Sequence, residues 1–412
     1  MVPPLRDAPF LTDPLVRHVL SLLSQDGDEA RVVGGAVRNA LLGLPVADVD
    51  IATTMLPEAV MAQAIAAGLK AVPTGIEHGT VTVIGQHRAV EVTTLREDIE
   101  TDGRRAVVRF GRDWAADAAR RDFTINAISV DLDGILHDTV GGLDDLAARR
   151  VRFIGSAETR IAEDRLRVLR FFRFHAAYGT GKPDAEGLSA AIRARQDLGE
   201  LSAERIGQEM RKLVVAAGAV ETVAIMQESG ILPLITASVA DLAAFAHLTD
   251  FEDGPPIPAL RFATLFARVG EDVDRIALRL RLSNGERRRM RAALEAATAL
   301  PSRNTISDHA LLYAIGREAF FDGLALASAR RMIPTEEAAT RKRAASAWAI
   351  PTFPLAGRDV VESGIDRGPL VGLILRHLER GWIEEDFAPD AEELRRRLQG
   401  MIAAAQQQQQ QQ

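Results

Sequence analysis

Short apolar runs alternate with short helical patterns in the first third of the chain. The runs are rich in β-branched residues, which predicts strands at residues 31–35, 48–53, 78–85 and 87–95. Helices are expected between them, one closed by Gly43 and one entered through Pro57, at residues 36–43 and 57–72. The polar segment 96–114 is expected to be a mobile loop, and strand character resumes at residues 120–134.

From about Arg149 the pattern becomes helical, with Gly and Pro as punctuation. The clearest amphipathic helices are expected at residues 163–179, 203–216 and 368–382. We therefore predict an α+β fold, in which an N-terminal α/β part with a mixed sheet precedes an all-helical part, with the junction near residue 150. The seven glutamines at 406–412 are of low complexity, and we expect that tail to be disordered.

The amino-acid composition excludes several kinds of site and constrains how the protein could bind nucleic acid. The 412 residues contain no cysteine, which excludes disulfides, a thiolate nucleophile and a cysteine zinc site. The net charge is −7, so contact with nucleic acid requires a local basic patch. Aromatic residues make up only 5%, which argues against single-strand binding by stacking on many rings. No targeting or membrane-spanning segment is visible, and we expect a soluble protein of the cytoplasm.

Asp48 and Asp50 are the first candidate site residues. In a strand, residues two apart project to the same face, and two adjacent carboxylates repel each other unless a cation lies between them. Mg²⁺ prefers such oxygen ligands, and two ions about 3.5–4 Å apart can activate a hydroxyl and stabilise a leaving pyrophosphate. An isolated D-x-D is more often a solvated strand face, so its neighbours decide the interpretation.

The neighbours favour a phosphate site. Gly34 and Gly35 follow a predicted strand and would let backbone N–H groups approach a triphosphate, while Arg38 lies one turn into the next helix. The spacing is neither that of a Rossmann fingerprint nor that of a Walker A loop. Glu91, in the run AVEVTT, is either a third carboxylate near the metals or a solvent-facing strand residue.

Two further segments carry candidate chemistry. In RRDFTINAI, Arg121 could meet a phosphate, whereas Asp122 and Asn126 could meet a ribose hydroxyl; a strand-entry ion pair is the alternative for Asp122. His137-Asp138 precedes two glycines, and we interpret it as part of a turn because a metal phosphohydrolase would need further His and Asp ligands.

The helix from Glu163 supplies the basic patch. Eight arginines and three acidic residues lie between residues 149 and 173, and four charged residues recur every third position, namely Asp164, Arg167, Arg170 and Arg173. A carboxylate accepts and a guanidinium donates hydrogen bonds, so Asp164 with Arg167 could read the amino group and ring nitrogen that cytosine and adenine share. Guanine and uracil would present a carbonyl to the carboxylate. The alternative is a solvated helix with ion pairs between neighbouring turns.

Five segments, in order, resemble the motifs of the class II tRNA nucleotidyltransferases, the bacterial CCA-adding enzymes with their poly(A) polymerase relatives. They are VVGGAVRNALLGLPVADVDIAT, RRDFTINAI, HDTVGGLDDL, EDRLRVLRFFRF and LSAERIGQEMRKLV, within residues 30–215. The resemblance implies a catalytic head at 1–148, a nucleotide-selecting neck at 149–220, and a tRNA-binding body and tail at 221–405.

The same resemblance implies addition of C, C and A to the tRNA 3′ end from CTP and ATP without a nucleic-acid template. Asp48 and Asp50 would bind Mg²⁺, and the loop at about 97–119 would be a flexible element. The incoming nucleotide would be bound by Gly35, Arg38, Arg121, Asp164, Arg167, Arg170 and Arg173. A poly(A) polymerase, a CC- or A-adding enzyme and an inactive RNA-binding protein remain alternatives, and no protein partner is inferred.

Overall fold

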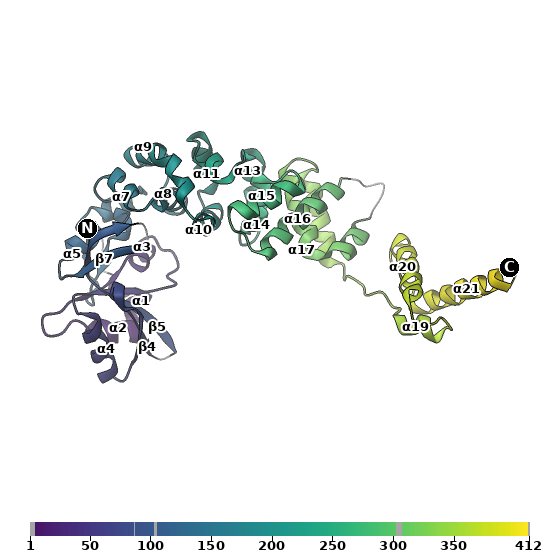
Figure 1. Ribbon diagram of the computed structural model, residues 1–412, viewed down its shortest axis with the longest axis horizontal. Coiled ribbons are helices and arrows are strands. Elements are labelled where there is room, and N and C mark those ends of the chain that lie inside the picture. The colour runs from purple at the N-terminus through teal and green to yellow at the C-terminus, as the bar shows by residue number, and fades with distance from the viewer. Residues whose placement is uncertain (1–4, 86, 103–104, 302–306, 411–412) are drawn as a thin grey trace. The chain divides into compact units, whose positions relative to one another are not determined.

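A seven-stranded mixed sheet lies in the N-terminal part of the computed structural model, which describes residues 5–85, 87–102, 105–301 and 307–410 (Figure 1). The strand order is β3-β4-β5-β2-β1-β8-β9, and β2 and β5 are the only parallel neighbours in this described sheet. The strands are β1 (Ala30–Val33), β2 (Asp50–Thr53), β3 (Lys70–Gly75), β4 (Thr80–Gly85), β5 (Arg88–Thr94), β8 (Ser129–Val130) and β9 (Leu136–His137).

Short helices pack on this sheet, and prolines set where several of them begin. Pro9, Pro14 and Pro57 each occupy the first helical position, where the missing N–H costs nothing. The helices of this region are α1 (Pro9–Thr12), α2 (Pro14–Leu22), α3 (Gly35–Leu41), α4 (Pro57–Ala66), α5 (Trp114–Ala119) and α6 (Gly142–Ala147). Central strand side chains such as Val32 and Ile51 are fully buried beneath them.

Two predicted elements differ in the structure. The helix predicted over 57–72 ends at Ala66, because Gly68 takes a positive φ of 77° and residues from Lys70 pair as β3 at the sheet edge. The predicted loop at 96–114 was wrong for its described residues. These form an antiparallel hairpin of β6 (Arg96–Asp102) and β7 (Arg105–Phe110), followed by α5; residues 103–104 lie outside the described part.

The predicted change to helices after residue 150 is confirmed. The helices that follow within the first unit are α7 (Ala157–Glu163), α8 (Leu166–Tyr178), α9 (Ala185–Arg193), α10 (Ala203–Val214), α11 (Ala219–Glu228) and α12 (Ile231–Thr236). Phe171 and Phe172 of α8 are fully buried, and the Phe171 ring stacks 5.5 Å from Phe153, which lies 4.8 Å from Phe123. This aromatic contact fixes α8 against the segment that follows α5.

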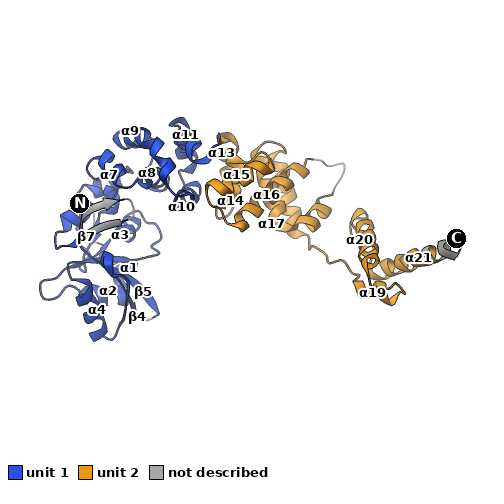
Figure 2. Cartoon of the chain, in the orientation of Figure 1, with its two compact units in different colours: residues 1–239 blue, residues 240–412 orange. Residues whose placement is uncertain are grey.

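The chain forms two compact units, residues 1–239 and 240–412 (Figure 2). All elements described in the second unit are helices: α13 (Leu242–Phe251), α14 (Pro258–Phe266), α15 (Gly270–Arg279), α16 (Asn284–Ala299), α17 (Asp308–Ala329), α18 (Thr335–Ala347), α19 (Gly357–Glu362), α20 (Pro369–Glu384) and α21 (Ala391–Gln410). The helix α21 continues through Gln410, so most of the predicted disordered tail is helical; residues 411–412 lie outside the described part. Among the described helices, we find none with the length and apolar character needed to cross a membrane.

Candidate nucleotidyltransferase site

Three carboxylates line one pocket of the N-terminal unit. Asp50 begins β2 and lies in register with Glu91 on the parallel strand β5, so their side chains project to the same face. Asp48 is exposed and lies just before the strand that was expected to contain it. The pocket that these three residues line has a volume of about 490 Å³. None of the three forms an ion pair or a side-chain hydrogen bond with another described residue.

The electrostatics of Asp50 reflect this crowding. Desolvation by the surrounding protein raises the pKa of Asp50, and the charges of Glu91 and Asp48 raise it further, while Arg121 opposes the rise. An additional cation near Asp50 would relieve the repulsion between the carboxylates. No group of three or more His, Asp or Glu side chains in the described ranges is placed to hold a metal unaided. Mg²⁺ commonly takes one or two carboxylates together with substrate phosphates and water, so the residues present fit such an ion.

The glycine turn lies on the β1 side of Asp50. Gly34, between β1 and α3, has a φ of 69°, and a Cβ built there would lie 3.6 Å from Nη1 of Arg121. Arg121 pairs with Asp117 at 3.1 Å, and its Nη1 donates to the main-chain oxygen of Asn126 at 3.4 Å. The structure therefore places the Gly34 turn against Arg121, whose charge acts on Asp50.

Arg38 is buried instead of facing solvent. Its Nη2 donates to the hydroxyl of Tyr178 at 2.7 Å, its Nη1 donates to Oδ1 of Asn126, and its guanidinium lies 4.0 Å from the Tyr178 ring centroid. Burial lowers the pKa of this guanidinium, and the nearby Tyr178 opposes that shift. Arg38 thus connects α3 to the end of α8, a contact between residues so distant in sequence that no local pattern revealed it.

Arg170 and Arg173 of α8 also have acidic partners. Nε of Arg170 donates to Oδ2 of the buried Asp122 at 2.8 Å, and Nδ2 of Asn126 donates to Oδ1 of Asp122 at 2.9 Å. Burial alone would raise the pKa of Asp122, but the Arg170 charge and these hydrogen bonds lower it. Arg173 forms an ion pair with Glu209 of α10. Asp122 and Asn126 are therefore satisfied by protein groups.

Asp164 and Arg167 lie together at the start of α8, but each pairs with another residue. Oδ2 of Asp164 accepts from Nη2 of Arg205 at 2.7 Å, and its Oδ1 accepts from the main-chain N–H of Leu166 at 3.1 Å. Arg167 pairs with Glu163. No sequence motif singled out Arg205, although the four-residue spacing of Arg205 and Glu209 on α10 indicates one charged helix face.

Asp138 lies in the predicted turn before Gly141 and Gly142, whereas His137 ends strand β9. The carboxylate of Asp138 accepts from the main-chain N–H groups of Val140, Gly142 and Leu143 at 3.1, 3.0 and 2.8 Å, which fixes the entry to α6. His137 pairs with Asp131 at 2.8 Å, away from the three carboxylates.

The fold and the site define the class. Residues 30–152 match the family model of the Poly A polymerase head domain, and this range contains the sheet, the glycine turn and the three carboxylates. The protein is therefore a nucleotidyltransferase with a head of this kind.

Relatives that match most of the chain identify the family within this class. The chain is 32% identical over 393 residues to the CCA tRNA nucleotidyltransferase 1, mitochondrial, of Mus musculus, covering 92% of this chain and 88% of that one. It is 33% identical to the CCA-adding enzyme of Leuconostoc citreum, covering 90% and 91%. The crystal structure of the Bacillus stearothermophilus CCA-adding enzyme in complex with CTP superposes with a TM-score of 0.77, at 28% identity over 99% and 100% of the two chains. The chain belongs to the family of CCA-adding tRNA nucleotidyltransferases.

Proposed function

We propose that this protein adds C, C and A in turn to the 3′ end of tRNA, from CTP and ATP, without a nucleic-acid template. The observation that supports this most strongly is the match to CCA-adding enzymes along nearly the whole chain, in the helical part as well as in the head. In each step the terminal 3′-oxygen forms a bond to the α-phosphorus, the bond between that phosphorus and the β-phosphate bridge breaks, and pyrophosphate leaves.

The family works with divalent metal ions, and we propose Mg²⁺ as the ion, held by Asp48 and Asp50, with Glu91 as a third carboxylate. When bound there, Mg²⁺ would acidify the attacking hydroxyl and balance the charge of the pyrophosphate. The register of Asp50 with Glu91 and the unpaired state of all three carboxylates support this assignment. The Gly35 turn and Arg121 would hold the triphosphate on the β1 side.

Base selection is assigned to the start of α8. The carboxylate of Asp164 would accept a hydrogen bond from the amino group of cytosine or adenine, and Arg167 would donate one to the adjacent ring nitrogen. Arg38, Arg170 and Arg173 complete the proposed nucleotide-binding set. Their contacts with Asn126, Asp122 and Glu209 hold them in place before the nucleotide arrives.

Nucleotide incorporation tests the proposal. A tRNA lacking its CCA end should gain two C residues from CTP alone, nothing from ATP alone, and one complete CCA from both. Long A tails on any RNA would instead identify a poly(A) polymerase, and an arrest after CC or a requirement for CC would identify a partial enzyme. Chelation should stop the reaction and added Mg²⁺ should restore it.

Two variants exclude an inactive RNA-binding protein. Asp48→Ala and Asp50→Ala should abolish incorporation while tRNA still binds, because they remove proposed metal ligands without touching the helical part. Undiminished incorporation would refute the assignment of these two residues. The tRNA-binding role of residues 221–405 and the cytoplasmic location stay predictions; filter binding of tRNA by substituted chains and cell fractionation would test them.

A further inference from the structure

The carboxylate site has a β1 side and a β5 side, and different residues lie on each. In the sheet, β2 lies between β1 and β5, so Asp50 has the glycine turn and Arg121 toward β1 and Glu91 toward β5. In nucleotidyl transfer, the attacking and leaving oxygens stand roughly in line on opposite sides of the phosphorus. With the triphosphate toward β1, which is the proposed function on which this inference rests, the attacking nucleotide must arrive from the β5 side.

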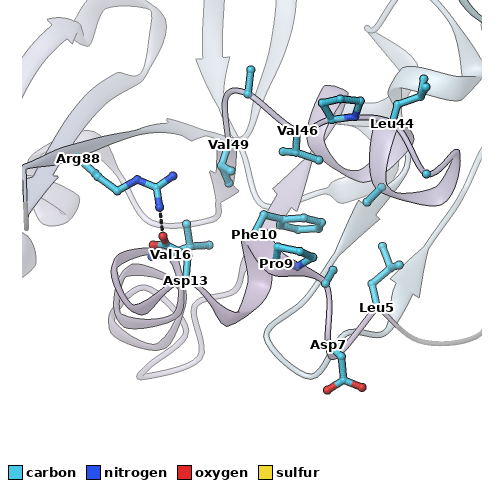
Figure 3. Close-up of a pocket in the computed structure, with 15 residues that line it drawn as sticks. Leu5, Asp7, Pro9, Phe10, Asp13, Val16, Leu44, Val46, Val49 and Arg88 are labelled. Atoms are coloured by element: carbon cyan, nitrogen blue, oxygen red, sulfur yellow. Dashed lines mark hydrogen bonds and ion pairs between the residues drawn. The ribbon is translucent and has the colours of Figure 1, made fainter.

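Two adjoining cavities share Arg88 at the start of β5, and the second extends from there along α1, α2 and the segment between α3 and β2. The first is the carboxylate pocket, and the second, of about 570 Å³, is walled mainly by apolar side chains that include Leu5, Phe10, Leu44 and Val46 (Figure 3). Five residues line both cavities: Asp13, Val16, Ala47, Val49 and Arg88. The second cavity is of the size that proteins use for small ligands, roughly 300–1,000 Å³.

Arg88 lies at the junction of the two cavities. It begins β5, where it pairs with Gly85 of β4, whereas the pairing of β5 with β2 begins only at Glu91, so Arg88 has no strand partner on the β2 side of the described sheet. One guanidinium nitrogen pairs with Asp13, whose other oxygen caps α2 by accepting from the N–H groups of Leu15 and Val16 at 3.0 and 3.1 Å (Figure 3). The Arg88 side chain is 60% exposed, and its other N–H groups have no partner among the described residues.

This arrangement has the chemical groups that a nucleotide-binding site needs. The carboxylate of Asp13 pairs with one side of the Arg88 guanidinium and leaves the N–H groups on its other side to donate to a phosphate. Beyond Arg88, the mainly apolar walls of the second cavity can contact a base through its faces. Such a cavity would accept different terminal bases in succession, as stepwise addition requires.

We propose that this apolar cavity, lined by Phe10, Leu44 and Val46, seats the 3′-terminal nucleotide of the RNA primer, and that Arg88 binds the phosphodiester on its 5′ side. Arg88 is thereby a positioning residue for the attacking hydroxyl, on the side of the carboxylates opposite to the incoming triphosphate.

Steady-state kinetics of the Arg88→Gln variant test whether Arg88 binds the phosphodiester of the primer. We expect kcat/KM for tRNA to fall roughly tenfold while KM for CTP is unchanged, since a charge-assisted contact of about 1.4 kcal/mol corresponds to that factor. The salt dependence of tRNA binding, as log K against log salt, should become shallower by about 0.7–1, the contribution of one phosphate contact. Arg17→Gln, an exposed arginine on α2 outside both cavities, is the matched control and should change neither quantity. An unchanged kcat/KM and salt slope in Arg88→Gln, or an equal rise in KM for CTP, would overturn the assignment.

The apolar wall is tested with Leu44→Asp, whose control is Leu56→Asp; both leucines are exposed, at 39% and 52%, but Leu56 lies outside the cavities. We expect Leu44→Asp to reduce kcat/KM roughly tenfold on a normal primer but little on a primer with an abasic terminal nucleotide, because the contact is already lost there. Equal losses of kcat/KM on both primers would overturn the proposal that this cavity binds the terminal nucleotide.

Cross-linking separates this inference from the proposed function, because it needs no turnover. A tRNA ending in 4-thiouridine should cross-link to residues 5–16 or 40–49 after irradiation. Cross-links confined to α8 would overturn the seat even if CCA addition is confirmed. If wild-type protein incorporates no nucleotide yet the cross-link forms at the cavity, the proposed function fails and the seat stands.

Discussion

At the scale of single residues, the arginines of the site are held by acidic partners before any ligand binds. Asp117 pairs with Arg121, Asp122 with Arg170 and Glu209 with Arg173, and these acidic side chains are buried. Such pairs fix the planar guanidinium groups, so less side-chain entropy is lost when a phosphate or base is bound. The three carboxylates of the proposed metal site, in contrast to these paired groups, have no cationic ion-pair partner among the described residues and repel one another.

Substituting Asp122 tests the cost of these pairs. Asp122→Asn removes the charge partner of the half-buried Arg170, and we expect a loss of about 1.5–3 kcal/mol in the free energy of unfolding at pH 7, the range for a hydrogen bond to a charged group. Glu158→Gln is the control, because the Glu158–Arg193 pair is exposed at 66% and 56% and should contribute under about 1 kcal/mol. Urea titrations measure both changes, and equal losses would contradict the buried-pair account.

The pH dependence of the same variant has a defined sign. The pKa of Asp122 is lowered in the folded state, so its contribution is complete above the unfolded value of about 3.9 and is lost as the pH falls toward the folded value. We therefore expect the stability difference between wild type and Asp122→Asn to be constant above about pH 5 and to shrink below about pH 4. A difference that grew on acidification would show the opposite sign.

The sequence indicated which residues carry charge at the site but not which of them pair. Asp48 and Asp50 could be singled out because a pair of acidic residues two apart is a local pattern, whereas the role of Glu91 stayed open because its register with Asp50 joins strands 41 residues apart. Arg205 is 41 residues from Asp164, and Tyr178 is 140 residues from Arg38, so these contacts depend on how helices pack. Eight arginines and few acids in one segment offer many pairings, and only the tertiary structure selects among them.

At the scale of elements, the junction of α7 and α8 fixes the proposed base-reading carboxylate. The sequence predicted one helix from Glu163, but Asp164 is extended, with φ −152° and ψ 109°, and α8 begins at Leu166. The side chain of Asp164 accepts the N–H of Leu166, two residues on, in an Asx turn that precedes α8, and periodicity alone could not separate this break from a continuous helix. Arg205 of α10 then holds the second oxygen.

Base choice should therefore depend on Arg205 as well as on Asp164. Asp164→Ala should relax discrimination against UTP and GTP, and Arg205→Gln should relax it less, by roughly tenfold, because the carboxylate stays but is no longer held. Lys212→Gln, an exposed position on the same helix, is the control. Competition assays with mixed nucleotides measure the ratio. Strict retention of C and A in Asp164→Ala would contradict the template role.

The β6–β7 hairpin contacts the main sheet at Gly79, the residue before β4. A Cβ there would lie 2.8 Å from the Phe110 ring, and Gly79 has a φ of 82°. Gly27 has nearly the same φ, 83°, but open space around it. Gly79→Ala should therefore destabilise more than Gly27→Ala by about 1–3 kcal/mol, which is the cost of displacing a packed ring. Equal losses in urea titrations would show that this contact contributes nothing.

At the scale of the whole molecule, the predicted order of an α/β head and a helical remainder is confirmed, and the predicted boundaries at 148 and 220 stay predictions. The first unit continues to residue 239, beyond the predicted neck boundary at 220. Helices lie on both sides of residue 239, so no change from strand to helix pattern could mark the division. The hairpin at 96–110 was missed because its charges and glycine are typical of loops.

This division predicts how a nucleotide stabilises the protein. Every residue that we assign to nucleotide binding lies in residues 1–239, so CTP with Mg²⁺ should raise the unfolding temperature of that unit and leave the transition of residues 240–412 unchanged. At a hundredfold excess over Kd the gain is about 2.7 kcal/mol, which corresponds to roughly 5–10 °C for a unit of this size. Differential scanning calorimetry should resolve the two transitions.

Gly79→Ala identifies the transition of the first unit, because it should lower that transition alone. With this assignment made, GTP serves as the control nucleotide: its triphosphate is the same, but a base that presents a carbonyl to Asp164 should give a smaller shift at equal concentration. Equal shifts for CTP and GTP would mean that the triphosphate supplies all the binding energy and that α8 selects only during catalysis. A shift of the second transition would place nucleotide contacts in residues 240–412 and contradict the assignment of the site to the first unit.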